Sequence, residues 1–104
     1  MIEVIHSYDL LPDVDQQAYA AWAKNAITIA SQQKGLVELR ANRNLLGSPQ
    51  ARTVSVWQSI SDWAQFNEGP WAPLEHDLRK LATNFKVEVW GPSPLMPKAL
   101  HPEK

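Results

Sequence analysis

The histidines are the side chains of this sequence best suited to acid–base chemistry near neutral pH, and there are three of them: His6, His76 and His101. An imidazole ordinarily titrates at about pH 6.5, so it can accept a proton from a phenol at neutral pH. No two histidines form a close ligand pair such as H-x-x-x-H, and cysteine is absent, so we expect no metal site. The sequence also has no glycine-rich phosphate loop and no G-x-S-x-G nucleophile motif.

His6 and His76 are the two candidates for catalysis. His6 shares one side of a predicted strand with Val4 and Tyr8, where it is either a base facing a pocket or a buried neutral histidine bonded to a backbone carbonyl. His76 lies on a predicted helix, about 140° around the axis from Trp71 and off the apolar stripe. It is therefore either a functional group at a pocket rim or a surface histidine.

Large aromatic side chains are the second notable feature, because five tryptophans outnumber the two tyrosines and two phenylalanines together. So many rings in 104 residues need somewhere to be buried. We expect Trp22, Trp63, Phe66 and Trp71 to line the space between helices and sheet. They form either ordinary core or the walls of a cleft for a flat apolar ligand, with an entrance at the Gly69-Pro70 break.

The elements that position these side chains follow from the hydropathy pattern and the turn residues. They are a strand at 2–8, a helix from Asp13 as N-cap to Gln33, a strand at 36–44, a strand at 52–60, a helix at 62–67 capped by Ser61, a helix at 71–83 and a strand at 85–90. The short link before the third strand predicts a hairpin. This β-α-β-β-α-β order predicts an α+β protein with a ferredoxin-like antiparallel sheet and its helices on one face.

The two faces of the predicted sheet differ in composition. The helix-facing set is Val37, Leu39, Val54, Val56, Phe85, Val87 and Val89, and the other face holds Glu38, Arg40, Thr53, Ser55, Trp57, Lys86, Glu88 and Trp90. The second set indicates either a wet face with scattered rings or an interface with a second copy. We expect a homodimer with Trp57, Trp90, Glu38 and Arg40 at the interface.

Composition and charge limit the possible partners. A net charge of −1 argues against nucleic acid and against a polybasic membrane anchor. No apolar run reaches the roughly 20 residues of a membrane span, and residues 1–10 do not resemble a signal peptide, so we expect a cytoplasmic protein. Residues 1–91 form the single predicted domain. Residues 92–104 are a proline-rich arm, expected to lie on its own domain or on a partner rather than in solvent.

One segment resembles a known family. Residues 53–66 (TVSVWQSISDWAQF) resemble the third strand and following helix of the antibiotic-biosynthesis-monooxygenase-like proteins, where a strand ends in Trp, a Ser follows and a short helix carries a buried aromatic. The resemblance covers about residues 2–91. It implies a dimeric α+β barrel in which two ferredoxin-like sheets face each other. The family includes cofactor-free oxygenases of aromatic polyketides and quinols, haem-degrading monooxygenases and proteins that are not oxygenases.

The haem-degrading branch of that family implies a different role for the second histidine. Its iron ligand is a histidine at a position similar to His76, acting with an aromatic that corresponds to Phe66 or Trp63. It also uses an asparagine near the end of the first strand, where this sequence has His6 and Ser7.

Three hypotheses follow. The first is a small cofactor-independent monooxygenase of an aromatic, polyketide or quinol-like substrate, with His6 as base and the aromatic residues as walls. The second is a non-catalytic dimeric binding or structural protein of the same fold. The third is haem binding or degradation through His76. Whether the chain is an enzyme is left open between the first two, with the enzyme favoured.

Overall fold

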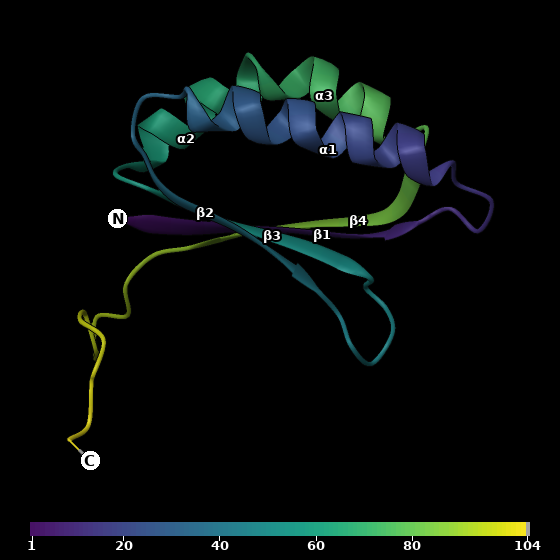
Figure 1. The fold of residues 1–104 in the computed structure, drawn as a ribbon. Coiled ribbons are helices and arrows are strands. Elements are labelled where there is room, and N and C mark those ends of the chain that lie inside the picture. Colours follow the sequence, from purple (N-terminus) through teal and green to yellow (C-terminus); the bar gives the residue numbers. More distant parts are fainter. Residues whose placement is uncertain (104) are drawn as a thin grey trace.

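The computed structural model describes residues 1–103, so Lys104, the last residue of the predicted arm, lies outside the described residues. The elements follow the order β-α-β-β-α-α-β (Figure 1). They are β1 (Ile2–Leu10), α1 (Gln16–Ser31), β2 (Leu36–Arg43), β3 (Ala51–Trp57), α2 (Ile60–Glu68), α3 (Trp71–Leu78) and β4 (Ala82–Trp90).

The four strands form one antiparallel sheet in the order β2-β3-β1-β4, and all three helices cover the same face of it (Figure 1). This arrangement confirms the predicted ferredoxin-like α+β fold. The predicted break in the second helical region is also present. Gly69 ends α2, and the chain resumes as α3 directly after Pro70, which cannot continue the hydrogen-bond ladder of a preceding helix.

Several predicted element boundaries are wrong, and three of them concern the helices. Asp15 rather than Asp13 caps α1, accepting hydrogen bonds from the backbone N–H groups of Gln17 and Ala18, and Ser59 rather than Ser61 caps α2. The last helix ends at Leu78 instead of near residue 83, because the chain turns there and β4 already begins at Ala82. Pairing with β1 decides this boundary, since Ala82 lies opposite Leu10 in the sheet.

The predicted orientation of β3 is also wrong, and this error matters most for the site. Thr53 and Ser55 lie opposite His6 and Val4 of β1, on the side of the sheet that faces the helices. Trp57 shares that side, is only 1% exposed and packs on Phe66 of α2 with ring centroids 5.3 Å apart. Because side chains alternate along a strand, Val54 and Val56 are directed to the opposite side.

The remaining predicted interface residues do lie on the open face of the sheet, the face without helices. Arg40 forms an ion pair with Glu38 on its own strand, and its guanidinium lies 3.4 Å from the carboxylate of Glu3. Trp90 is paired with Glu3 in the sheet and is 53% exposed. Lys86 and Glu88 form a further pair at 3.7 Å. This face therefore combines charges of both signs with an exposed indole ring.

The proline-rich segment leaves the sheet after Trp90 and does not pack on its own domain. Residues 91–103 are exposed, with Leu95 at 96%, and the segment extends away from the open face of the sheet (Figure 1). The expectation that it could lie against its own domain is therefore wrong. The alternative, contact with a second copy, stays a prediction.

Replacing Trp57 by Ala removes the ring that joins the sheet to α2. We expect a loss of about 3–5 kcal/mol in the free energy of unfolding, because a large buried side chain leaves a cavity that cannot fully collapse. Chemical denaturation measures this loss. The control is Ile60→Ala, where the side chain is 59% exposed and the expected change is within about 0.5 kcal/mol. Equal effects of the two substitutions would contradict the buried position of Trp57.

Candidate functional site: an aromatic-walled cavity

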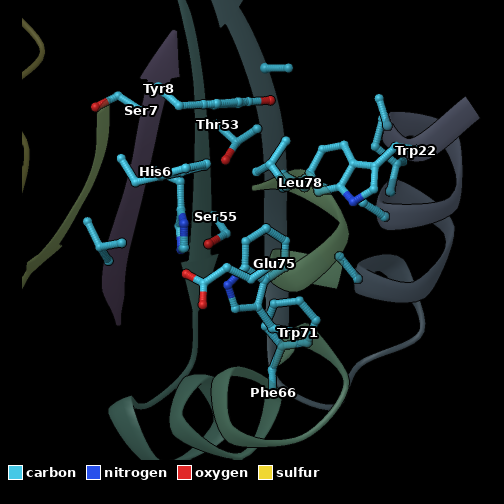
Figure 2. A pocket seen from close by; sticks show the side chains of 18 of the residues that line it. His6, Ser7, Tyr8, Trp22, Thr53, Ser55, Phe66, Trp71, Glu75 and Leu78 are labelled. Atoms are coloured by element: carbon cyan, nitrogen blue, oxygen red, sulfur yellow. The ribbon is translucent and has the colours of Figure 1, made fainter. Parts of the chain in front are cut away.

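A cavity of about 210 Å³ lies between the helix layer and the sheet (Figure 2). Its volume follows from small side chains on facing elements. Ala23, Ala26 and Ala30 of α1 line it from the helix layer, and Thr53 and Ser55 of β3 line it from the sheet. These side chains are too short to meet across the gap, so the space between the layers stays open where larger residues would have filled it.

Eight Tyr, Trp and Phe side chains also line the cavity. The cavity is lined by Tyr8, Tyr19, Trp22, Trp57, Trp63, Phe66, Trp71 and Phe85, and this set includes all four residues predicted to line the cleft. The rings hold one another in place. Trp71 contacts Trp22 edge-on and Phe66 at a tilt, each with centroids 6.1 Å apart. Such contacts give rigid, flat, apolar walls suited to an aromatic ligand.

His6 lies in the wall of this cavity and meets the edge of the Trp71 ring, with centroids 5.1 Å apart. Burial lowers the pKa of His6 below 6.5, and the carboxylate of Glu75 raises it in part. The imidazole is therefore neutral at physiological pH. A neutral imidazole with an acidic neighbour can accept a proton, and the neighbouring charge then stabilises the cation that forms.

Two tyrosine hydroxyls lie further along the same wall. Tyr8 is two residues from His6 on the same side of β1, and its hydroxyl oxygen lies 2.6 Å from that of Tyr19 on α1. Burial and this hydrogen bond raise the pKa of Tyr8 far above its usual value. Tyr8 therefore stays protonated, and the pair adds hydrogen-bonding capacity to a cavity whose walls are otherwise mainly apolar.

The indole N–H groups of three cavity tryptophans differ in their hydrogen bonding. Trp22 donates to the backbone carbonyl of Leu74 at 2.9 Å, and Trp57 donates to the hydroxyl of Ser55 at 2.8 Å. Within residues 1–103, the Nε1–H of Trp71 is buried and has no acceptor. A buried donor without an acceptor costs about 1–3 kcal/mol, so its presence in a cavity wall requires an explanation.

The two predicted catalytic histidines are thus not equivalent. His6 lines the cavity, whereas His76 is exposed on α3 and does not line it. The neighbouring residue Glu75, which sequence reasoning missed as a site residue, takes the place that faces the cavity. The sequence could have indicated this position, because Glu75 follows Trp71 by four residues and residues four apart on a helix share a face.

The haem hypothesis does not fit this geometry. The proposed ligand His76 is exposed and does not line the cavity, and the cavity is smaller than the roughly 300–1,000 Å³ of pockets that hold drug-sized ligands.

In the described part of the chain, no group of three or more His, Cys, Asp or Glu side chains could hold a metal ion. No helix of residues 1–103 has the length and apolar character needed to cross a membrane.

Comparison with solved structures defines the class of fold. The chain resembles the cofactor-independent oxygenase SnoaB from Streptomyces nogalater, with a TM-score of 0.74 and 12% identity over 93% of this chain and 97% of that one. It also resembles a candidate antibiotic biosynthesis monooxygenase from Deinococcus radiodurans, with a TM-score of 0.72 and 12% identity over the full length of both chains. The chain therefore has an antibiotic-biosynthesis-monooxygenase-like fold, in agreement with the resemblance of residues 53–66.

A third neighbour is a dimeric protein of unknown function and ferredoxin-like fold from Bacteroides fragilis, with a TM-score of 0.65 and 9% identity over 86% of this chain and 93% of that one. No family model matches the chain, and no curated protein matches its sequence. At these identities the likeness establishes the fold, and the chemistry has to be argued from the site.

The lowered pKa of His6 predicts a pH dependence of stability. In the unfolded chain His6 binds a proton below about pH 6.5, whereas the folded protein resists that proton until lower pH. Its contribution to stability is therefore complete above pH 6.5 and is lost as the pH falls toward the folded pKa. We expect the melting temperature to drop between pH 7.5 and 5.0, and to drop less in His6→Asn.

The matched control for this measurement is His76→Asn, because His76 is exposed. This variant should keep the pH dependence of the wild type. If His6→Asn and His76→Asn have the same pH dependence as the wild type, His6 does not titrate from a buried site.

Proposed function

We propose that the protein is a small cofactor-independent monooxygenase whose cavity binds an aromatic, phenol- or quinol-like substrate. The observation that supports this most directly is the position of His6 in a cavity lined by aromatic rings, where burial lowers its pKa. The fold it shares with a cofactor-independent oxygenase supports the same class of reaction. In such chemistry the substrate anion itself reduces dioxygen, so the protein has to deprotonate, orient and shield it.

The size of the cavity limits the substrate. About 150 Å³ suffices for a benzene molecule in an engineered protein cavity, so about 210 Å³ suits a ring system of one or two fused rings. Larger polyketide substrates would need the cavity to open further at its mouth. Tyr19 and Ala41 line both the cavity and a neighbouring groove, which indicates where it would open.

The proposed step balances as one phenol plus one dioxygen giving one quinone plus one water. His6 takes the hydroxyl proton, and the resulting anion passes electrons to dioxygen. A carbon–oxygen bond forms on the ring, the oxygen–oxygen bond breaks, and the second oxygen leaves as water with the two hydrogens that the substrate loses. Glu75 stabilises the imidazolium while His6 holds the proton, and the aromatic walls exclude bulk water.

The proposal predicts oxygen consumption without added cofactor when the protein is given naphthols, quinols or anthrones. Replacing His6 by Ala should lower kcat by roughly 10²–10⁴-fold, as for the loss of a general base. An oxygen electrode provides the measurement. His76→Ala is the control and should retain the wild-type rate, because the side chain lies outside the cavity. If the panel binds but no oxygen is consumed, the non-catalytic binding protein replaces the enzyme.

We also propose that a second copy of the chain packs on the open face of the sheet. This face has acidic and basic side chains that can pair across a twofold axis, namely Glu3, Glu38, Arg40, Lys86 and Glu88, and it exposes Trp90. The dimeric ferredoxin-like neighbour supports this assembly. Two such sheets facing each other would form the dimeric α+β barrel implied by the family resemblance.

Two exposed apolar segments project on the same side of the sheet and fit this assembly. The tip of the β2–β3 hairpin carries Leu45 and Leu46, and the segment after β4 carries Leu95 and Leu100, all nearly or largely exposed. Both segments extend beyond the open face of the sheet (Figure 1). In the proposed dimer they would contact the partner, with residues 1–91 as the domain and residues 92–104 as the arm.

The dimer predicts a mass of twice 11.7 kDa in light scattering at roughly 10 μM protein. Trp90→Asp should give a folded monomer, because a carboxylate cannot be buried in the interface without a partner. Ile60→Asp places the same charge on the helix layer, so it should leave the mass unchanged. A wild-type chain that is monomeric under these conditions would rule out the proposed interface.

A further inference from the structure

The buried indole N–H of Trp71 is the polar group that the proposed mechanism leaves unused. Trp22 and Trp57 line the same cavity, and each satisfies its own N–H within the chain, through the carbonyl of Leu74 and the hydroxyl of Ser55. The N–H of Trp71 has no acceptor within the described residues. Buried donors are nearly always paired, so the missing acceptor is expected to come from a molecule in the cavity.

The surroundings of Trp71 define the kind of acceptor that would fit. Its ring meets His6 edge-on, and the side chains of His6, Trp71 and Glu75 converge on one end of the cavity (Figure 2). A ligand oxygen accepting from Trp71 would therefore lie near the imidazole. Phe66 and Trp22 pack against Trp71 and fix its ring, so the donor is held in place before the ligand arrives.

We propose that Trp71 is a ligand-binding residue whose Nε1–H donates to an oxygen substituent on the aromatic ring of the ligand. The inference rests on the cavity being the ligand site of the proposed function. It adds the residue that recognises the oxygen substituent of the ligand through a hydrogen bond. The same oxygen is the group that His6 deprotonates. The N–H would then bind the resulting oxyanion more strongly than the neutral hydroxyl, because hydrogen bonds to charged acceptors are the stronger ones.

Glu75 is the competing acceptor within the chain. It lies one helical turn after Trp71, so a change of side-chain rotamer could bring its carboxylate to the indole N–H. Arg79 opposes this change. Its guanidinium lies 3.6 Å from the Glu75 carboxylate and is itself placed over the ring of Phe85, 4.6 Å from the centroid. If a ligand oxygen is the acceptor, replacing Trp71 weakens recognition of that oxygen. If Glu75 is the acceptor, replacing Trp71 leaves that recognition unchanged.

The test compares two ligands of nearly equal shape, 2-naphthol and 2-methylnaphthalene, by anaerobic titration calorimetry. The measured quantity is the ratio of their Kd values. In Trp71→Phe we expect the preference for 2-naphthol to fall by roughly 5–100-fold, the range for losing one hydrogen bond to a buried donor. Trp90→Phe is the control. It also removes an indole N–H, but Trp90 is 53% exposed and does not line the cavity, so the preference should stay within about twofold.

A second measurement needs no variant to fold. In the wild-type protein, the Nε1–H proton resonance of Trp71 should shift downfield with 2-naphthol and move much less with 2-methylnaphthalene. An unchanged preference in Trp71→Phe, or equal shifts with both ligands, would overturn the inference in favour of Glu75 as the acceptor. The calorimetric titration is anaerobic, so it reports binding alone. Selective binding there, together with no oxygen consumption in the aerobic assay, would support the role of Trp71 and reject only the proposed reaction. If neither ligand binds, both proposals are rejected.

Discussion

The burial of Trp57 between the sheet and α2 is the contact on which the site depends. Side chains alternate along a strand, so fixing one residue of β3 fixes the direction of every other. With Trp57 packed on Phe66, Ser55 and Thr53 must face the helices, and the valines between them must face away. The short hydroxyl side chains then lie opposite the alanines of α1, and the cavity is the space that neither layer fills.

That cavity sets the chemistry of the groups around it. His6 would be an ordinary imidazole on an exposed strand, but beneath the helices burial favours its neutral form. The same burial keeps Tyr8 protonated. Glu75 acts against the effect on His6, because a nearby negative charge favours the imidazolium. A base that is neutral at rest and stabilised once protonated is suited to taking a proton from a weak acid.

The sheet separates the proposed ligand site from the proposed dimer interface. Its helix-covered side holds the cavity. Its open side holds paired charges and Trp90, and two exposed apolar segments project from that side. A second copy on the open side would close the sheet without entering the cavity. Glu38, Glu88 and Trp90 of the open face do not line the cavity, so substitutions at these positions can alter the proposed interface separately from the ligand site. The same fold can accommodate different reactions, because the side chains that line the cavity can change while the strands and helices keep their arrangement.

The sequence by itself determined the order of elements, the broken second helical region, the antiparallel sheet and the set of aromatic residues around the cleft. These features depend on local periodicity, turn residues and helix breakers, which act over a few positions. The sequence pattern also separated His76 from the apolar stripe of its helix. It did not decide which side of β3 faces the core, because Val54 and Val56 suited burial as well as Trp57 did. Nor could it show that Glu75 lies near His6, or that the N–H of Trp71 has no acceptor within residues 1–103. Those outcomes depend on contacts between elements far apart in the chain, and only the packing of α2 and α3 on the sheet decides them.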